Sequence, residues 1–154
     1  MTTILDKKAL DVTGEALQGA LVDLLDLSLQ GKQAHWNLTG PLFRELHLQL
    51  DKMVKLARGH ADTLAERAAA LGVSPDGRAK TIAAGSPLPD IGPGKISDQK
   101  VIDDVTDMLE KASARMRQRV ADTDDTDLVT QDLLITATQD LEQQAWFFRS
   151  HRIS

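Results

Sequence analysis

The chain has 154 residues, which suits a single domain with one sizeable core. It contains no cysteine, so disulfides and thiolate metal sites are excluded, and a bound metal must take its ligands from His, Asp, Glu or carbonyl oxygen. The formal net charge of −5 makes the body of the protein a poor partner for nucleic acid, and no signal peptide or bilayer-spanning apolar run is evident. We therefore expect one domain over residues 1–154, with short terminal tails, located in the cytoplasm.

Apolar residues recur at helical spacing over most of the chain. The periodicity predicts a first helix over about residues 5–38. Gly40 and Pro41 then interrupt the pattern, and we expect Pro41 at the first position of a second helix, because its missing N–H would have no helical partner there. Gly72 is the expected end of that helix, since glycine readily adopts the left-handed conformation that follows many helix C-termini.

A long connection follows over residues 73–96, which contain four of the five prolines. Its AKTIAA stretch leaves room for one short helix. Ser97 is a candidate N-cap for a third long helix, and a fourth follows the acidic turn ADTDDTD and ends near Phe148. Two short links separated by one long crossover are the connectivity of ferritin-like bundles. The expected fold class is therefore all-α, a four-helix bundle with a short extra helix in the crossover.

Four potential metal ligands share one stripe of the second helix. At ~100° per residue, Asp51, Asp62 and Glu66 lie about 40°, 60° and 100° from His47 around the helix axis. Asp51 and Asp62 are nevertheless about 16 Å apart along that axis, at ~1.5 Å per residue. Metal–ligand bonds are only about 2 Å long, so one helix cannot close both pairs around one ion.

A second copy of the helix solves this difficulty. The outer pair, His47 and Glu66, has the same midpoint in the sequence as the inner pair, Asp51 and Asp62. Two copies crossing antiparallel on a two-fold axis would therefore bring the first half of one stripe to the second half of the other. His35, near the end of the first helix, can reach the same region. Two imidazoles and three carboxylates suit Fe(II) or Mn(II), with Zn(II) as a competitor.

A structural interpretation of the same residues stays open. Helical carboxylates usually face water, Glu66 could pair with a nearby arginine, and a histidine on a leucine-rich face is more often hydrogen-bonded than metal-bound. His60 points about 140° away from the stripe, and we expect it to be structural or exposed. A purely structural bundle leaves the common midpoint unexplained. A di-iron oxygenase with its site in the bundle core needs Glu-x-x-His pairs, and the chain has none.

HWNLTGPLFRELHLQLD, followed by HADTLAERAAALG, resembles the ferroxidase signature of the Dps family, the mini-ferritins named for DNA protection during starvation. LVTQDLLITATQDLEQQAWFF resembles the last helix of that family. The resemblance implies a hollow dodecamer with di-iron centres at two-fold interfaces. In each centre His35, His47 and Asp51 come from one subunit, and Asp62 and Glu66 from its neighbour. The implied activity is oxidation of Fe(II), with hydrogen peroxide preferred over oxygen, and storage of ferric mineral in the cavity.

The resemblance also suggests that acidic residues after the third helix line pores through which iron enters. Asp127 and Asp132 are the candidates, whereas helix capping is the stronger interpretation for Asp124 and Asp125. Trp36 adjoins the metal site in sequence. It is either a local electron donor, grouped with the catalytic residues, or a packing residue at the interface.

DNA binding is where the sequence departs from the family name. Family members that condense DNA generally carry a lysine-rich tail, whereas the ends of this chain offer only four basic residues: Lys7, Lys8, Arg149 and Arg152. A further basic stretch on the third long helix is expected to be a solvated face or to form ion pairs between subunits: Lys111, Arg115, Arg117 and Arg119. We expect weak or no DNA binding. The alternative function is a nucleoid protein with secondary iron chemistry.

Overall fold

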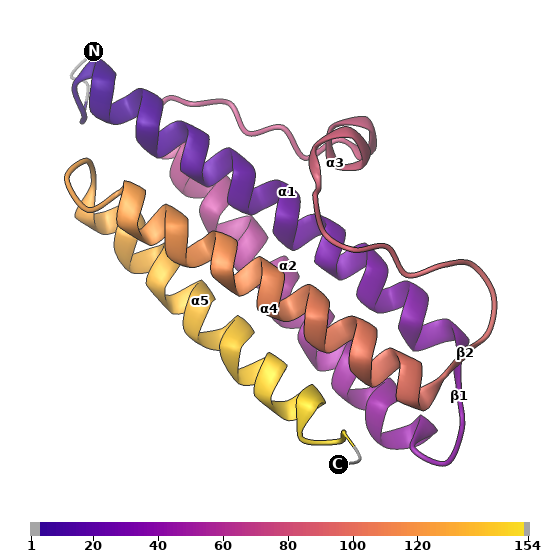
Figure 1. Cartoon of the computed structure of the whole chain (residues 1–154). Helices are drawn as coiled ribbons and strands as arrows, with labels where there is room; N and C mark the ends of the chain where they lie inside the picture. The colour runs from indigo at the N-terminus through magenta and orange to yellow at the C-terminus, as the bar shows by residue number, and fades with distance from the viewer. Residues whose placement is uncertain (1–3, 153–154) are drawn as a thin grey trace.

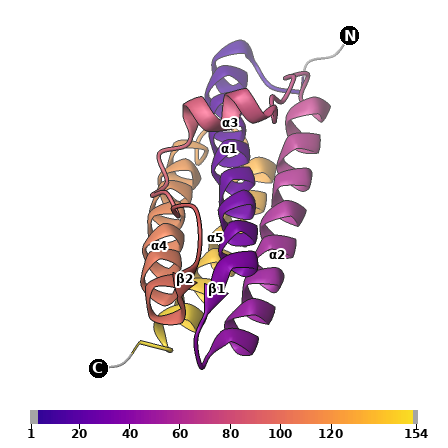
Figure 2. The ribbon, with the colours of Figure 1, turned by 90° about the vertical axis from the view of Figure 1, so that its right-hand side faces the viewer.

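A computed structural model of the chain describes residues 4–152; residues 1–3 and 153–154, which belong to the expected tails, lie outside the described part. The helices are α1 (Lys7–Asn37), α2 (Phe43–Ala70), α3 (Ala79–Gly85), α4 (Asp98–Asp122) and α5 (Leu128–Arg149). The four long ones form a bundle in which α1 lies along α2 and α4 along α5 (Figure 1). The short α3 belongs to the long connection from α2 to α4 and lies against α1 (Figure 2). The expected all-α fold and its ferritin-like connectivity are therefore confirmed.

Each long helix buries one apolar face in a common core. Leu24, Leu50, Leu109 and Leu141, one from each long helix, are at most 1% exposed. Burial of a leucine side chain contributes about 1.5–3 kcal/mol, so these periodic residues supply the main driving force for the bundle. In the described part of the chain, no helix is both long enough and apolar enough to cross a bilayer.

The link between α1 and α2 differs from the expectation for Pro41. Pro41 lies in the turn itself, and α2 begins two residues later at Phe43, whose N–H donates to the Gly40 carbonyl at 3.0 Å. The N–H of Leu42 donates to the carboxylate of Asp98 at 2.9 Å. The start of α2 is thus fixed by the first residue of α4, a contact between segments far apart in sequence, and not by proline at the first helical position.

A two-residue parallel ladder joins this link to the end of the crossover. Strand β1 (Leu38–Thr39) pairs with β2 (Ile96–Ser97). Each strand is a buried apolar residue followed by an exposed polar one, and two residues are too few to establish a strand pattern in the sequence. Ser97 also accepts a hydrogen bond from the Lys100 N–H, which confirms it as the N-cap of α4.

Gly72 terminates α2 as expected. Its φ is +87°, and its N–H donates to Ala69 O at 3.0 Å while the Val73 N–H donates to Ala68 O at 2.9 Å. This pair of hydrogen bonds defines the Schellman motif, which requires a left-handed residue after the helix. The crossover therefore leaves α2 at a fixed point.

All three arginines of the basic stretch on α4 form ion pairs within the chain. Arg115 and Arg119 each donate to the buried carboxylate of Asp23 on α1 at 2.8 Å, and Arg119 is only 8% exposed. Arg117 pairs with Glu142 on α5. The expectation of a solvated face or subunit contacts is therefore wrong for Arg115 and Arg119, because α4 packs against α1 and can reach a carboxylate buried between the two helices.

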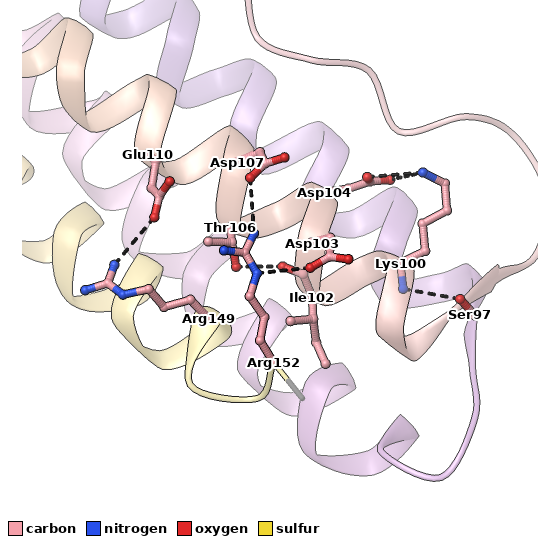
Figure 3. Close-up of polar contacts among 10 residues, drawn as sticks. All are labelled: Ser97, Lys100, Ile102, Asp103, Asp104, Thr106, Asp107, Glu110, Arg149 and Arg152. Atoms are coloured by element: carbon pink, nitrogen blue, oxygen red, sulfur yellow. Dashed lines mark hydrogen bonds and ion pairs between the residues drawn. The ribbon is translucent and has the colours of Figure 1, made fainter. Parts of the chain in front are cut away.

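The end of α5 is tied to α4 by ion pairs (Figure 3). Arg152 donates to Asp103 at 3.0 Å and to Asp107 at 3.2 Å, and Arg149 lies 3.7 Å from Glu110. The two basic residues near the C-terminus are thus matched with carboxylates of the same chain.

Gly40 provides a test of the link between α1 and α2. Its φ is +128°, and a Cβ there would lie 2.5 Å from the carboxyl carbon of Asp98. We expect Gly40→Ala to lower the free energy of unfolding by about 2 kcal/mol or more, since a non-glycine residue is strained in this conformation. Denaturant unfolding measures the effect. Gly92→Ala, with nothing within 4 Å of its added Cβ, should change stability by less than ~0.5 kcal/mol. Equal stability of both variants would contradict the proposed role of this link.

Candidate metal centre

His35, near the C-terminal end of α1, and His47, near the start of α2, form a stacked pair. Their ring centroids are 3.6 Å apart and their planes differ by 12°. The Nδ1 atom of His35 lies 2.7 Å from the carbonyl oxygen of His47, and the Nδ1 atom of His47 lies 2.8 Å from the carbonyl oxygen of His35. A carbonyl oxygen only accepts, so both rings carry their proton on Nδ1. Each imidazole therefore fixes the orientation of the other.

The free nitrogen of each ring is the one a metal would use. With Nδ1 protonated and donating, the neutral imidazole has its lone pair on Nε2. A hydrogen bond from the second ring nitrogen to a carbonyl is the usual way in which proteins orient a metal-binding histidine. His35 is 9% exposed and His47 is half-buried, so the pair is partly shielded from solvent within the chain.

Asp51 lies one turn beyond His47 and forms an ion pair with Lys32 of α1. The hydrogen bond from the Lys32 ammonium lowers the pKa of Asp51 more than burial raises it, and the charge of Lys32 lowers that pKa further. Asp51 is therefore ionised at neutral pH and lies one helical turn beyond His47 on α2. These three residues form one half of the predicted ligand set.

The other half lies further along the same helix. Asp62 and Glu66 are exposed, and in residues 4–152 neither side chain forms a hydrogen bond or an ion pair. Arg67, beside Glu66, instead donates to Asp127 at 2.7 Å. Because α2 is continuous from Phe43 to Ala70, the helix keeps the two halves apart. Within the described residues no three His, Asp or Glu side chains come close enough to hold one ion.

Two contacts at this site could not be derived from the ligand pattern. Phe43 stacks on the outer face of His47 with centroids 4.9 Å apart, and Lys32 holds Asp51. Helical spacing carried a weak signal for both, because Phe43 lies one turn before His47 and Lys32 lies almost one turn before His35. Neither residue type is a metal ligand, so a search for ligands does not select them.

The other residues singled out from the sequence are separate from this pair. Trp36 is 69% exposed on α1, so its indole does not pack in the core of the chain. His60 is half-buried and its Nε2 lies 2.6 Å from a carboxylate oxygen of Asp140 on α5, which confirms a structural role away from the ligand stripe.

The two candidate pore residues differ in their surroundings. Asp127 is 8% exposed, caps α5 by accepting from the Thr130 N–H, and binds Arg67. Its burial alone would raise the pKa of Asp127, but the hydrogen bonds from Thr130 and Arg67 hold that pKa below its usual value. Asp132 is exposed one turn further along α5. Of the two carboxylates, Asp132 is the one accessible to solvent in a single chain.

Comparisons with known proteins agree with this architecture. The family model described as "Ferritin-like domain" matches residues 14–152. The "DNA protection during starvation protein 2" of Deinococcus radiodurans is 40% identical over 136 residues, which are 88% of this chain and 56% of that protein, so the chain spans little more than half of this relative. The "DNA protection during starvation protein" of Mycolicibacterium smegmatis is 38% identical over 160 residues, covering 95% of this chain and 79% of that protein.

A solved structure is similar to this chain in both sequence and fold. The structure of Mycobacterium smegmatis Dps superposes with a TM-score of 0.94 at 35% identity, and the alignment covers 100% of this chain and 94% of that one. The fold, the matched domain and two relatives of this similarity together show that the chain belongs to the Dps family of ferritin-like proteins.

Proposed function

We propose that this protein is a ferroxidase and iron-storage subunit whose metal centres form between two-fold-related copies of the chain. The observation that carries the proposal is the divided ligand set on α2. His35 and His47 already lie together and Asp51 follows one turn later on α2, whereas Asp62 and Glu66 lie on the same stripe beyond the reach of one ion. An antiparallel second copy supplies the missing carboxylates to each half.

The exposed apolar side chains support contact with another copy on this side of the molecule. Leu29 and Trp36 of α1 and Phe43 and Leu48 of α2 are each between 44% and 69% exposed. Apolar side chains gathered on a surface are typical of protein interfaces. Family membership suggests how far the assembly extends, and we propose a hollow dodecamer of the single domain 1–154, located in the cytoplasm.

The proposed chemistry follows from the types of ligand. Fe(II) is the substrate, held by the Nε2 atoms of the histidines and by carboxylate oxygens, which as hard ligands favour the Fe(III) product. Two Fe(II) ions at one centre supply two electrons together, so hydrogen peroxide with two protons is reduced to two waters and no hydroxyl radical is released. Peroxide is the proposed oxidant, with oxygen as the alternative, and Mn(II) or Zn(II) would compete for the ligands. The ferric product would be stored as mineral in the cavity.

Two further residue roles belong to this proposal. Trp36, next to His35 in sequence and exposed, is placed either to donate an electron to stray oxidising equivalents or to pack against the neighbouring copy. Asp132 is the better candidate for the iron-entry pore. Asp127, the other pore candidate, would have to break its contacts with Arg67 and Thr130 before it could bind iron.

The alternative function is DNA binding with secondary iron chemistry. The surroundings of the basic termini speak against it, because Arg149 and Arg152 are paired with α4 carboxylates and Lys7 pairs with Asp11. Phosphate contacts supply most non-specific affinity for DNA, and neutralised cations contribute little to it.

The ferroxidase proposal predicts loss of activity without loss of assembly in a ligand variant. His47→Ala combined with Asp62→Ala should lower the initial rate of peroxide-driven Fe(II) oxidation by on the order of 100-fold, since ligands from both halves are gone. The measurement is the rise of ferric absorbance after anaerobic Fe(II) loading and peroxide addition. Sizing of the same samples shows whether the assembly is intact.

The matched control for this variant is His60→Ala, which removes a histidine of the same helix outside the stripe. We expect it to keep the rate of the unmodified protein. Equal rates for the ligand variant and the unmodified protein would mean that iron is oxidised elsewhere, and the stripe would then be an ordinary charged helix face.

The pore proposal predicts slower mineral formation in Asp132→Asn. Removal of one exposed carboxylate from every subunit lowers the local concentration of Fe(II), so uptake should slow severalfold while ferroxidase ligands stay intact. Stopped-flow iron uptake measures this, with Asp90→Asn, an exposed carboxylate on the crossover, as the control. An unchanged uptake rate in Asp132→Asn would remove this residue from the entry path.

The DNA alternative predicts a gel shift that we do not expect. At about 150 mM salt the full-length protein should leave linear duplex DNA unshifted at micromolar concentration, because screening leaves little attraction between a net acidic protein and phosphate. A tight shift that persists at this salt concentration would instead favour the nucleoid protein.

A further inference from the structure

A groove runs between α1 and α4, which lie side by side in the bundle (Figure 1). Its volume is about 780 Å³, and we call it the α1–α4 groove. All of its lining residues belong to these two helices and none to α2. At ~100° per residue, its Gly19 lies about 100° around α1 from Trp36, which is on the exposed apolar side. The proposed pairing of α2 stripes therefore does not use this groove.

A buried ion cluster forms the floor of the groove. Arg115 and Arg119 both donate to the same oxygen of Asp23, Oδ2, at 2.8 Å. Asp23 is 1% exposed, and its other oxygen, Oδ1, has no hydrogen-bond partner in residues 4–152. One carboxylate between two guanidinium groups leaves a formal excess of one positive charge. Because a buried charge without a counter-charge is costly, the cluster favours binding of one more anion.

Arg119 presents an unpaired edge to the groove. Its side chain is only 10% exposed, and its Nη1 atom donates to Asp23, whereas Nε and Nη2 form no hydrogen bond in the described part of the chain. Neither nitrogen is among the fully buried atoms that lack a partner, so both are open to the groove that Arg119 lines. Nε and Nη2 share one edge of the guanidinium, and that edge can donate two parallel hydrogen bonds to one carboxylate.

Gly19 leaves the space that this guanidinium occupies. A Cβ at this position would lie 2.8 Å from Nη2 and 3.1 Å from Nε of Arg119. Glycine is unfavourable within a helix, because it loses more conformational freedom on folding than other residues do. Its presence inside α1 is explained by the guanidinium packed against it, since any side chain would displace the unpaired edge.

We propose that the α1–α4 groove binds a small organic monocarboxylate through the Nε–Nη2 edge of Arg119. A single negative charge compensates the excess charge of the buried cluster. Three apolar residues of the lining suit a short aliphatic tail: Val12, Ala16 and Ala114. A pocket with mostly apolar contacts and a few placed polar groups is typical of sites for small molecules.

The rest of the lining disfavours a second negative charge on the ligand. Glu15 and Asp122 line the groove and carry negative charge themselves. The remaining cation of the lining, Lys111, already donates to the carbonyl oxygen of Pro87 at 2.8 Å. Like charges placed close together select against a ligand. Phosphate and dicarboxylates should therefore bind more weakly than a monocarboxylate.

The side chain of Glu15 is a second source of the same carboxylate chemistry. Glu15 is exposed, lines the groove and lies one turn before Gly19 on α1. If its carboxylate occupied the edge of Arg119, an added carboxylate would bind only after Glu15 was replaced. The two sources are therefore distinguishable by experiment.

The test is equilibrium dialysis of the full-length, assembled protein against labelled isovalerate at neutral pH. We expect saturable uptake that unlabelled isovalerate displaces and that isoamyl alcohol, its uncharged analogue, does not. Arg119→Lys keeps the charge but removes the paired donors, and Gly19→Ala places a methyl group against them. Each should weaken the affinity on the order of tenfold, as expected for loss of one charge-assisted hydrogen bond. Sizing and circular dichroism verify that each variant is folded and assembled.

Two controls isolate the groove. Arg117→Lys makes the same change on the same helix outside the groove and should keep the affinity of the unmodified protein. His47→Ala should lose iron oxidation but retain isovalerate uptake, because the proposal does not rest on the ferroxidase activity.

Three outcomes would overturn the proposal. The first is no saturable uptake by the unmodified protein, and uptake by Glu15→Gln alone would assign the edge to Glu15 instead. The second is unchanged affinity in both Arg119→Lys and Gly19→Ala. The third is equal displacement by isoamyl alcohol, which would mean that the groove binds the aliphatic tail without recognising the carboxylate.

Discussion

The length of a metal–ligand bond is the constraint on which the rest of this account depends. Such bonds are about 2 Å long, whereas Asp51 and Asp62 are separated by about 16 Å of continuous helix. The helix does not bend to bring them together, because α2 is unbroken from Phe43 to Ala70 and its opposite face is buried in the core. In the proposed centre, a single subunit therefore presents two half-sites and completes neither.

Contacts within the chain orient the two histidines of the first proposed half-site. The Nδ1 atom of each histidine donates to the backbone carbonyl of the other, and these reciprocal hydrogen bonds between His35 and His47 fix both tautomers. The pair can form only if the end of α1 and the start of α2 are held in register. That register depends on the link at Gly40, on the bond from Leu42 to Asp98, and therefore on the start of α4. The fold and the site are coupled at this corner of the bundle.

Much of this could be predicted from the sequence, for identifiable reasons. Helix ends at Gly72 and Ser97, the short helix in the crossover and the shared stripe all follow from local chemistry or from periodicity. The missed features depend on contacts between distant segments. Pro41 lies outside α2, and the Leu42 N–H that follows it donates to the carboxylate of Asp98. Arg119 is buried because its guanidinium donates to the buried carboxylate of Asp23 on α1. Lys32 and Phe43 belong to the site through packing, which no ligand pattern encodes.

The most direct test of a centre divided between two subunits is complementation. His47→Ala subunits and Asp62→Ala subunits would be unfolded together, mixed in equal amounts and reassembled, and the number of active centres would be measured by peroxide-driven Fe(II) oxidation. Each mixed two-fold pair regains one intact centre, so random pairing should restore about a quarter of the activity of the unmodified protein, although each variant alone is inactive. Mixed assemblies as inactive as the separate variants would contradict a centre divided between two subunits.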